Sequence, residues 1–267
     1  MFNIQHEYKP TLINNNFLNL TNEDIRQLLQ ERKLGAIVTD LPYGTIKNST
    51  WDYDLNLEHM WQWITNVSKE FNVNLPVIST SSQPFTSKLI VSNLKHYSHN
   101  WVWNKKLAGN GMLAKKQPLK IHEDVVVFYM GSVVYYPQMV TGKPRKKMTK
   151  VDNIKGYGTY GETITVDEYY NDQYYPQSII EFSVAHLRGK KRRHLAEKPI
   201  ELYEYLIQTY TQPNEVVLDI CMGSGTTCIA AHNVGRHCVG IEIDEEIYRN
   251  AKQKVLEYTK GLNYTND

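Results

Sequence analysis

Cysteine is scarce in this chain, and its few copies show no arrangement typical of a cross-link or a metal site. The sequence has three cysteines, an odd number without CxxC spacing. Neither a disulfide framework nor a zinc site is therefore expected, and no other metal site is predicted. Cys221, Cys228 and Cys238 lie among apolar or small residues, and we interpret them as buried, unreactive thiols.

Long apolar runs are also missing. No stretch approaches the roughly 20 apolar residues of a membrane span, and the N-terminal ten residues lack the apolar core of a secretory signal. Hydrophobic residues make up 41% of the chain and charged residues 22%, a balance typical of globular rather than disordered proteins. The sequence therefore predicts a cytoplasmic globular protein without a membrane segment.

Net charge is small, at +2, but the basic residues bunch locally. Such clusters can follow a phosphate backbone on an otherwise neutral protein, although each run is equally well explained as a solvated loop. The runs are Lys105-Lys106, Lys115-Lys116, the segment with Lys143, Arg145, Lys146 and Lys147, and the segment with Arg188, Lys190, Lys191, Arg192 and Arg193.

Short apolar strands alternate with helical periodicity along most of the chain. This alternation predicts an α/β fold, a doubly wound and mostly parallel sheet. Thr21 is expected to cap the first helix and Gly35 to end it. The strands are expected at 36–39, 75–79, 101–103, 125–129, 215–219 and 237–241, and the other helices at 57–71, from 84, at 199–210, from 226 and from 245.

The composition and the hydrophobic pattern of the sequence change between residues 131 and 178. Tyrosine, proline, glycine and lysine are frequent there, without sustained periodicity, which predicts an irregular insertion. Residues 1–130 and 179–267 are then expected to form the main domain.

A glycine turn lies between a predicted strand and a predicted helix, where open α/β sheets bind nucleotide-like ligands. Glu242 follows the next strand and could accept hydrogen bonds from ribose hydroxyls. The third glycine of GxGxxG and the GKS/T context of a P-loop are both missing, so S-adenosylmethionine suits the turn better than a dinucleotide or a nucleotide triphosphate. The turn comprises Asp219, Ile220, Cys221, Met222, Gly223, Ser224, Gly225, Thr226 and Thr227.

A second turn, Asp40-Leu41-Pro42-Tyr43, also follows an apolar strand. The amine of a nucleobase is a poor nucleophile, and hydrogen-bond acceptors around it stabilise the positive charge that develops during methyl transfer. Asp40 and a main-chain carbonyl could supply these acceptors, and Tyr43 a face for stacking an extruded base. Taken alone, such a tetrapeptide is more often an ordinary turn.

Together the two turns resemble the amino-methyltransferases of DNA, in the permuted (beta) group whose (D/N/S)PP(Y/F) motif precedes FxGxG. The resemblance covers most of the chain. Further matching segments are 101–105, 121–125, 175–179, His194 to Pro199, which resembles HPTQKP, and 240–244.

The resemblance implies a Rossmann-like S-adenosylmethionine-dependent fold and assigns roles to individual residues. Asp40 and the carbonyl of Leu41 would hold the target amine, and Lys198 would lie near the carboxylate of the cofactor. In the family a Gly-Asp pair contacts the adenine of the cofactor, and Asn16 stands at that place in this sequence. Leu41 stands where the (D/N/S)PP(Y/F) motif of the family has its first proline. Ile220-Cys221 stands where the family has Pro-Phe before the glycines.

The resemblance also implies a site-specific enzyme for double-stranded DNA, in a restriction-modification, phage or orphan context. Aspartate at position 40 favours N6 of adenine, with N4 of cytosine as the alternative. Methylation of cytosine C5 is excluded, since no Pro-Cys pair occurs. Segments 131–178 and 188–193 would recognise the target. A cognate endonuclease and a homodimer are compatible with this reading, and an inert DNA-binding relative or a nicotinamide-dependent oxidoreductase are the competing hypotheses.

Overall fold

The computed structural model describes residues 8–44, 52, 54–71, 73–147, 169–184 and 197–261. The chain divides into two compact units. The larger unit comprises Met1–Tyr136 and Ser178–Asp267, and the smaller unit comprises Pro137–Gln177.

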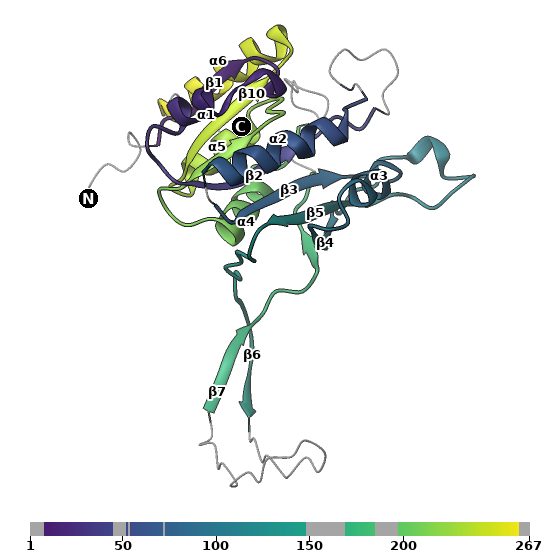
Figure 1. The fold of residues 1–267 in the computed structure, drawn as a ribbon. Helices are drawn as coiled ribbons and strands as arrows, with labels where there is room; N and C mark the ends of the chain where they lie inside the picture. Colours follow the sequence, from purple (N-terminus) through teal and green to yellow (C-terminus); the bar gives the residue numbers. More distant parts are fainter. Residues whose placement is uncertain are drawn as a thin grey trace. The chain divides into compact units, whose positions relative to one another are not determined.

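An eight-stranded sheet forms the centre of the larger unit (Figure 1). β5 is antiparallel to both neighbours, whereas the other adjacent strands are parallel. The mostly parallel sheet predicted from the sequence is therefore confirmed. In spatial order the strands are β1 (Thr11–Asn14), β10 (His237–Glu242), β9 (Val216–Asp219), β2 (Leu34–Asp40), β3 (Leu75–Ser81), β5 (His122–Met130), β4 (Tyr97–Asn104) and β8 (Ile179–Glu181).

Helices cover both faces of this sheet. α1 (Asn22–Leu29), α2 (Leu57–Glu70) and α3 (Phe85–Ser92) contribute to one apolar core, and α4 (Ile200–Tyr210), α5 (Thr226–Asn233) and α6 (Glu245–Thr259) to the other. Successive strand residues point to opposite faces, so Ile37 lies in the first core and Val38 in the second. The sheet is doubly wound, as expected. No helix in the described part of the chain is long and apolar enough to cross a membrane.

The first helix ends differently from the prediction. Its last residue is Leu29, and Gln30 follows with a φ of 49° in the left-handed region. Gly35 lies inside β2 instead, where a Cβ would stand 2.7 Å from Oε2 of Glu215. The prediction that Gly35 ends the helix is wrong, because this glycine is needed for close packing against Glu215.

Two short edge strands and one strand pair were not predicted. β1 and β8 have four and three residues, too few to show a period of two. In the smaller unit, β6 (Val140–Lys147) pairs antiparallel with β7 (Tyr169–Tyr174). This part of the segment expected to be irregular is therefore regular, and its pairing joins residues far apart in the sequence.

Candidate functional site

The two turns singled out in the sequence follow neighbouring strands. β2 and β9 are parallel, with Ile37 opposite Leu218, so their carboxyl ends lie at the same edge of the sheet. β3 lies beyond β2 and β10 beyond β9, in opposite directions. Such a reversal opens a crevice at the carboxyl ends of the strands, where α/β proteins bind ligands.

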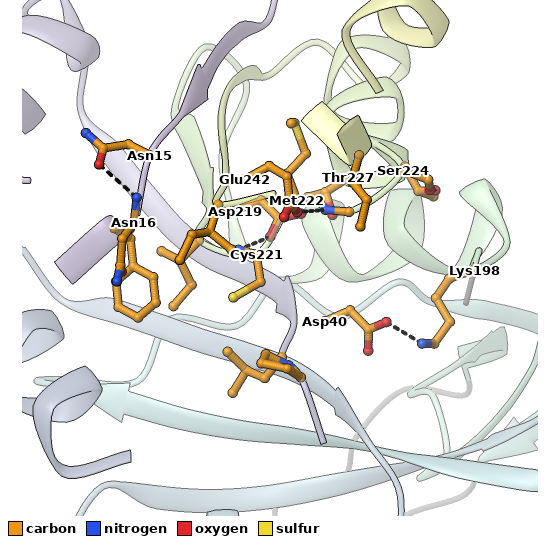
Figure 2. A pocket seen from close by; sticks show the side chains of 18 of the residues that line it. Asn15, Asn16, Asp40, Lys198, Asp219, Cys221, Met222, Ser224, Thr227 and Glu242 are labelled. Atoms are coloured by element: carbon orange, nitrogen blue, oxygen red, sulfur yellow. Dashed lines mark hydrogen bonds and ion pairs between the residues drawn. The ribbon is translucent and has the colours of Figure 1, made fainter. Parts of the chain in front are cut away.

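Both turns line one pocket of about 770 Å³, its open mouth included. Figure 2 shows their side chains around it. The lining residues expected from the sequence are Asn16, Asp40, Leu41, Pro42, Lys198, Asp219, Met222, Gly223, Ser224, Thr226, Thr227 and Glu242. Gly225 and Tyr43 are not among the lining residues.

The two glycines of the turn serve different purposes. Both have positive φ, 52° at Gly223 and 78° at Gly225, a conformation that glycine adopts without strain. A Cβ on Gly223 would meet nothing within 4 Å, whereas one on Gly225 would stand 2.6 Å from Cγ2 of Val255 in α6. Gly223 therefore leaves space for a ligand, and Gly225 lets α6 pack against the turn.

Glu242 ties the glycine turn to the end of β10. Its Oε2 accepts a hydrogen bond from the N–H of Gly223 at 2.9 Å, and its Oε1 one from the N–H of Asp244 at 3.0 Å. The residue is 6% exposed. Burial raises the pKa of Glu242, and the backbone donors oppose that rise. Its carboxylate is held in a fixed direction at the pocket wall.

Asp219 lies deeper and is more strongly affected by burial. Only 1% of it is exposed, and its Oδ1 accepts from the N–H of Cys221 at 3.2 Å. Burial raises the pKa of Asp219 to about 7, against the opposing effect of hydrogen bonds such as that from Thr227. Asp40, Asp219 and Glu242 thus place three carboxyl groups around one pocket. A ligand with positive charge would offset the unfavourable burial of these groups.

Asp40, the first residue of the other turn, has partners on both carboxylate oxygens. Oδ1 accepts hydrogen bonds from Thr80 of β3 and from the hydroxyl of Tyr43, the latter at 2.9 Å. Oδ2 is ion-paired with Lys198 (Figure 2). Burial would lower the pKa of Lys198, but the charges of Asp40 and Glu123 outweigh it and raise that pKa. Lys198 therefore stays charged beside Asp40.

Tyr43 does not line the pocket, and its ring packs against the same apolar core in which Leu41 is buried. Its ring stacks on that of Phe85, with centroids 5.1 Å apart and planes 23° apart. Burial raises the pKa of Tyr43, so its hydroxyl remains a donor to Asp40. One ring face is thus occupied by the protein, and Nζ of Lys198 lies 5.8 Å from the ring centroid.

Asp52 holds this turn in place and was not anticipated from the sequence. Its Oδ1 accepts hydrogen bonds from the N–H groups of Tyr43 at 2.7 Å and of Gly44 at 2.8 Å. Asp52 is 7% exposed. A buried carboxylate that accepts from two successive N–H groups fixes the path of the backbone beside Asp40.

For the methyl transfer that the sequence resemblance implies, we expect Asp52→Ala to lower turnover about tenfold to a hundredfold, because the turn loses two charge-assisted hydrogen bonds of about 1.5–3 kcal/mol each. Cofactor affinity should change little. Asp52→Asn keeps an acceptor oxygen and should restore most of the turnover. Steady-state kinetics on the three proteins would check this, and equal losses in the alanine and asparagine variants would contradict it.

Apolar side chains also line the pocket. They come from Phe17 in the short 3₁₀ helix η2 (Phe17–Asn19), Ile220, Ile243 and Ile247. The N–H of Asn15 donates to the carbonyl of Glu242 at 3.0 Å, which brings this segment to the pocket. Phe17, Tyr203, Ile243 and Ile247 were not predicted. Ile243 directly follows Glu242, and this adjacency is the one signal that could have indicated it.

Few of the basic residues predicted to contact DNA can be placed. Lys143 accepts a hydrogen bond at its carbonyl from the hydroxyl of Tyr174, and the guanidinium of Arg145 lies 4.6 Å from the ring centroid of Tyr174. Both residues belong to β6. The side chains of Lys146 and Lys147 lie outside the described residues, as do Arg188, Lys190, Lys191, Arg192 and Arg193.

Comparison with known proteins matches residues 34–253 to a family described as N6/N4 DNA methylase. The chain is 26% identical to the type II methyltransferase M.HpaI of Haemophilus parainfluenzae, over 88% of this chain and 72% of that protein. It is 25% identical to the DNA adenine methyltransferase YhdJ of Escherichia coli K12, over 89% and 82%. The crystal structure of an M1.HpyAVI–SAM complex shares its fold, with a TM-score of 0.58 at 22% identity over 92% of this chain and 98% of the other.

Proposed function

Because the chain belongs to the N6/N4 DNA methylase family, we propose that it transfers a methyl group from S-adenosylmethionine to N6 of adenine in double-stranded DNA. One observation carries the proposal: the turn with Asp40 and the turn with Gly223 line a single pocket. An amine held at one turn would thereby face a methyl donor held at the other.

The pocket fits the chemical groups of S-adenosylmethionine. Asp219 and Glu242 are buried carboxyl groups suited to an ammonium group and to ribose hydroxyls. Apolar lining residues such as Phe17 and Ile243 suit an adenine ring, and the open space at Gly223 admits a ligand close to the backbone. The bound cofactor would supply the methyl group from its sulfonium.

Asp40 has an acceptor site left for the target amine. A carboxylate offers about four lone-pair sites, and the described partners Thr80, Tyr43 and Lys198 use three of them. The remaining site is on Oδ2. A hydrogen bond from the amine at this site stabilises the positive charge that grows on nitrogen. Lys198 and Tyr43 hold the carboxylate of Asp40 in a fixed orientation.

The proposal of adenine N6 is supported by aspartate at position 40 and by the similarity to a DNA adenine methyltransferase. N4 of cytosine is the second candidate, since the matched family includes both reactions and the same acceptor site would serve either amine. A base must leave the duplex to reach a site of this kind. The cognate endonuclease and the homodimer remain predictions.

The function is tested by incubating the purified protein with unmethylated genomic DNA and S-adenosylmethionine, and identifying the modified nucleoside by mass. We expect N6-methyladenine. N4-methylcytosine would correct the base and leave the mechanism, whereas no methylated nucleoside would overturn the proposal. Saturation with the cofactor at about 100 times its dissociation constant should also stabilise the fold by roughly 2.7 kcal/mol, and NAD should not.

A further inference from the structure

The loop that joins β4 to β5, residues 105–121, exposes apolar and basic side chains together. Met112 is fully exposed and stands beside Lys115 and Lys116, which are exposed and have no carboxylate partner among the described residues. The other exposed apolar residues of the loop are Leu113, Leu119 and Ile121, whose exposed fractions are 42%, 48% and 44%. Isolated exposed apolar residues are common, but a group of them on one loop indicates a contact surface.

Hydrogen bonds within the loop give it a defined shape. Asn110 accepts from the N–H of Lys120 at 2.6 Å and donates to the carbonyl of Pro118 at 3.2 Å. The N–H of Gly109 donates to the carbonyl of Lys120 at 3.1 Å. Met112 is carried by the 3₁₀ helix η3 (Gly111–Leu113) beyond this closure. The side chain of Met112 is therefore exposed to solvent on an ordered turn, and no residue of the described chain packs against it.

The loop begins at the edge of the sheet that carries the pocket. Its Lys120 donates to Ser82, just after the end of β3, and Asp40 lies opposite Thr80 of β3. Lys105, at the other end of the loop, is ion-paired with Glu123 at 2.8 Å, and the charge of Glu123 acts on Lys198. In Figure 1 the loop continues past the ends of β4 and β5 on the side where β3 ends.

We propose that loop 105–121 enters the DNA duplex beside the target base, with Met112 as an apolar wedge and Lys115 and Lys116 on neighbouring phosphates. This inference rests on the proposed function. An extruded base leaves a gap in the stack, and proteins that open base steps insert apolar side chains such as methionine between them. These two exposed cations complement the phosphate backbone.

The wedge is tested by methylation of two duplexes, one fully paired and one mismatched at the target base. Met112→Ala should lower kcat/KM about tenfold on the paired duplex and less than about twofold on the mismatched one, where unstacking is already easier. Val91→Ala removes a 69% exposed side chain from α3 and serves as the control, with no change on either duplex. Equal losses on both duplexes, or no loss, would overturn the wedge.

A binding measurement separates this inference from the proposed function. Neutralising both cations, Lys115→Ala with Lys116→Ala, should reduce the slope of log K against log salt by about two for duplex DNA. An unchanged slope in a protein that methylates DNA would overturn the proposed role of the loop and leave the proposed function intact. A reduced slope in a protein that does not methylate DNA would support DNA binding by the loop and overturn the proposed function. If Met112→Ala instead changes the mass in sedimentation while DNA binding stays the same, the loop is a contact between copies and the proposal fails.

Discussion

Asp40→Ala is expected to lower kcat about a hundredfold to a thousandfold, while S-adenosylmethionine binds within a few-fold of its wild-type affinity. The variant loses the acceptor that we propose stabilises charge on the target amine, and the loss of one preorganised polar group of this kind costs about 10²–10³ in rate. It also leaves Lys198 without its ion-pair partner. Turnover measured under single-turnover conditions, with cofactor binding measured by calorimetry, checks both expectations.

Asp40→Asn is the matched control for that experiment. Asparagine keeps one acceptor oxygen of similar position but cannot pair with Lys198 as an anion. We expect its activity to lie between those of the wild type and the alanine variant. Thermal unfolding of both variants separates loss of chemistry from loss of structure. Near-normal turnover in a folded alanine variant would refute the role of Asp40.

Asp219→Asn is expected to stabilise the ligand-free protein at pH 8 and to remove much of its pH dependence between pH 5 and pH 8. The folded pKa of Asp219 is raised to about 7 from an ordinary value of 3.8. The folded state therefore binds the proton more tightly than the unfolded state, and stability falls as pH rises through this interval. A pKa difference of about three between the folded and unfolded states corresponds to about 4 kcal/mol in the free energy of unfolding. We expect about half of this change or more to be measured between pH 5 and pH 8.

Urea unfolding at pH 5, 6.5 and 8 measures this effect. Asp54→Asn changes a carboxyl group whose side chain is 84% exposed and should leave the pH profile unchanged. The asparagine at position 219 should also weaken binding of S-adenosylmethionine at least tenfold, since an amide cannot neutralise an ammonium group. Parallel pH profiles for the wild type and Asp219→Asn would contradict the burial argument.

Local patterns predicted the sheet and both turns because each depends on neighbours in the sequence. Strand content and helix caps, such as Thr21 before α1 and the glycine turn before α5, can be read within a few residues. Asp40 and Gly223 were placed in one site because strand order in such folds brings the two turns together. Gly35 was misread because its need for glycine comes from Glu215, a contact that no local pattern records.

The missing parts of the site are those that depend on tertiary contacts. Asp52 acts on the turn through backbone N–H groups, and an isolated aspartate in a sequence does not show what it accepts. Lys198 lines the pocket, and its ion pair with Asp40 was not anticipated. Phe17 and Ile247 reach the pocket from segments at opposite ends of the chain.

The junction between β2 and β9 has a kinetic consequence. These strands come from distant parts of the chain and must pair before the two turns can meet. Pairings between remote segments form slowly, because a long loop must close first. The binding crevice should therefore be among the last features to appear as the protein folds from the ribosome, and ligand capture would report that folding of the whole domain is complete.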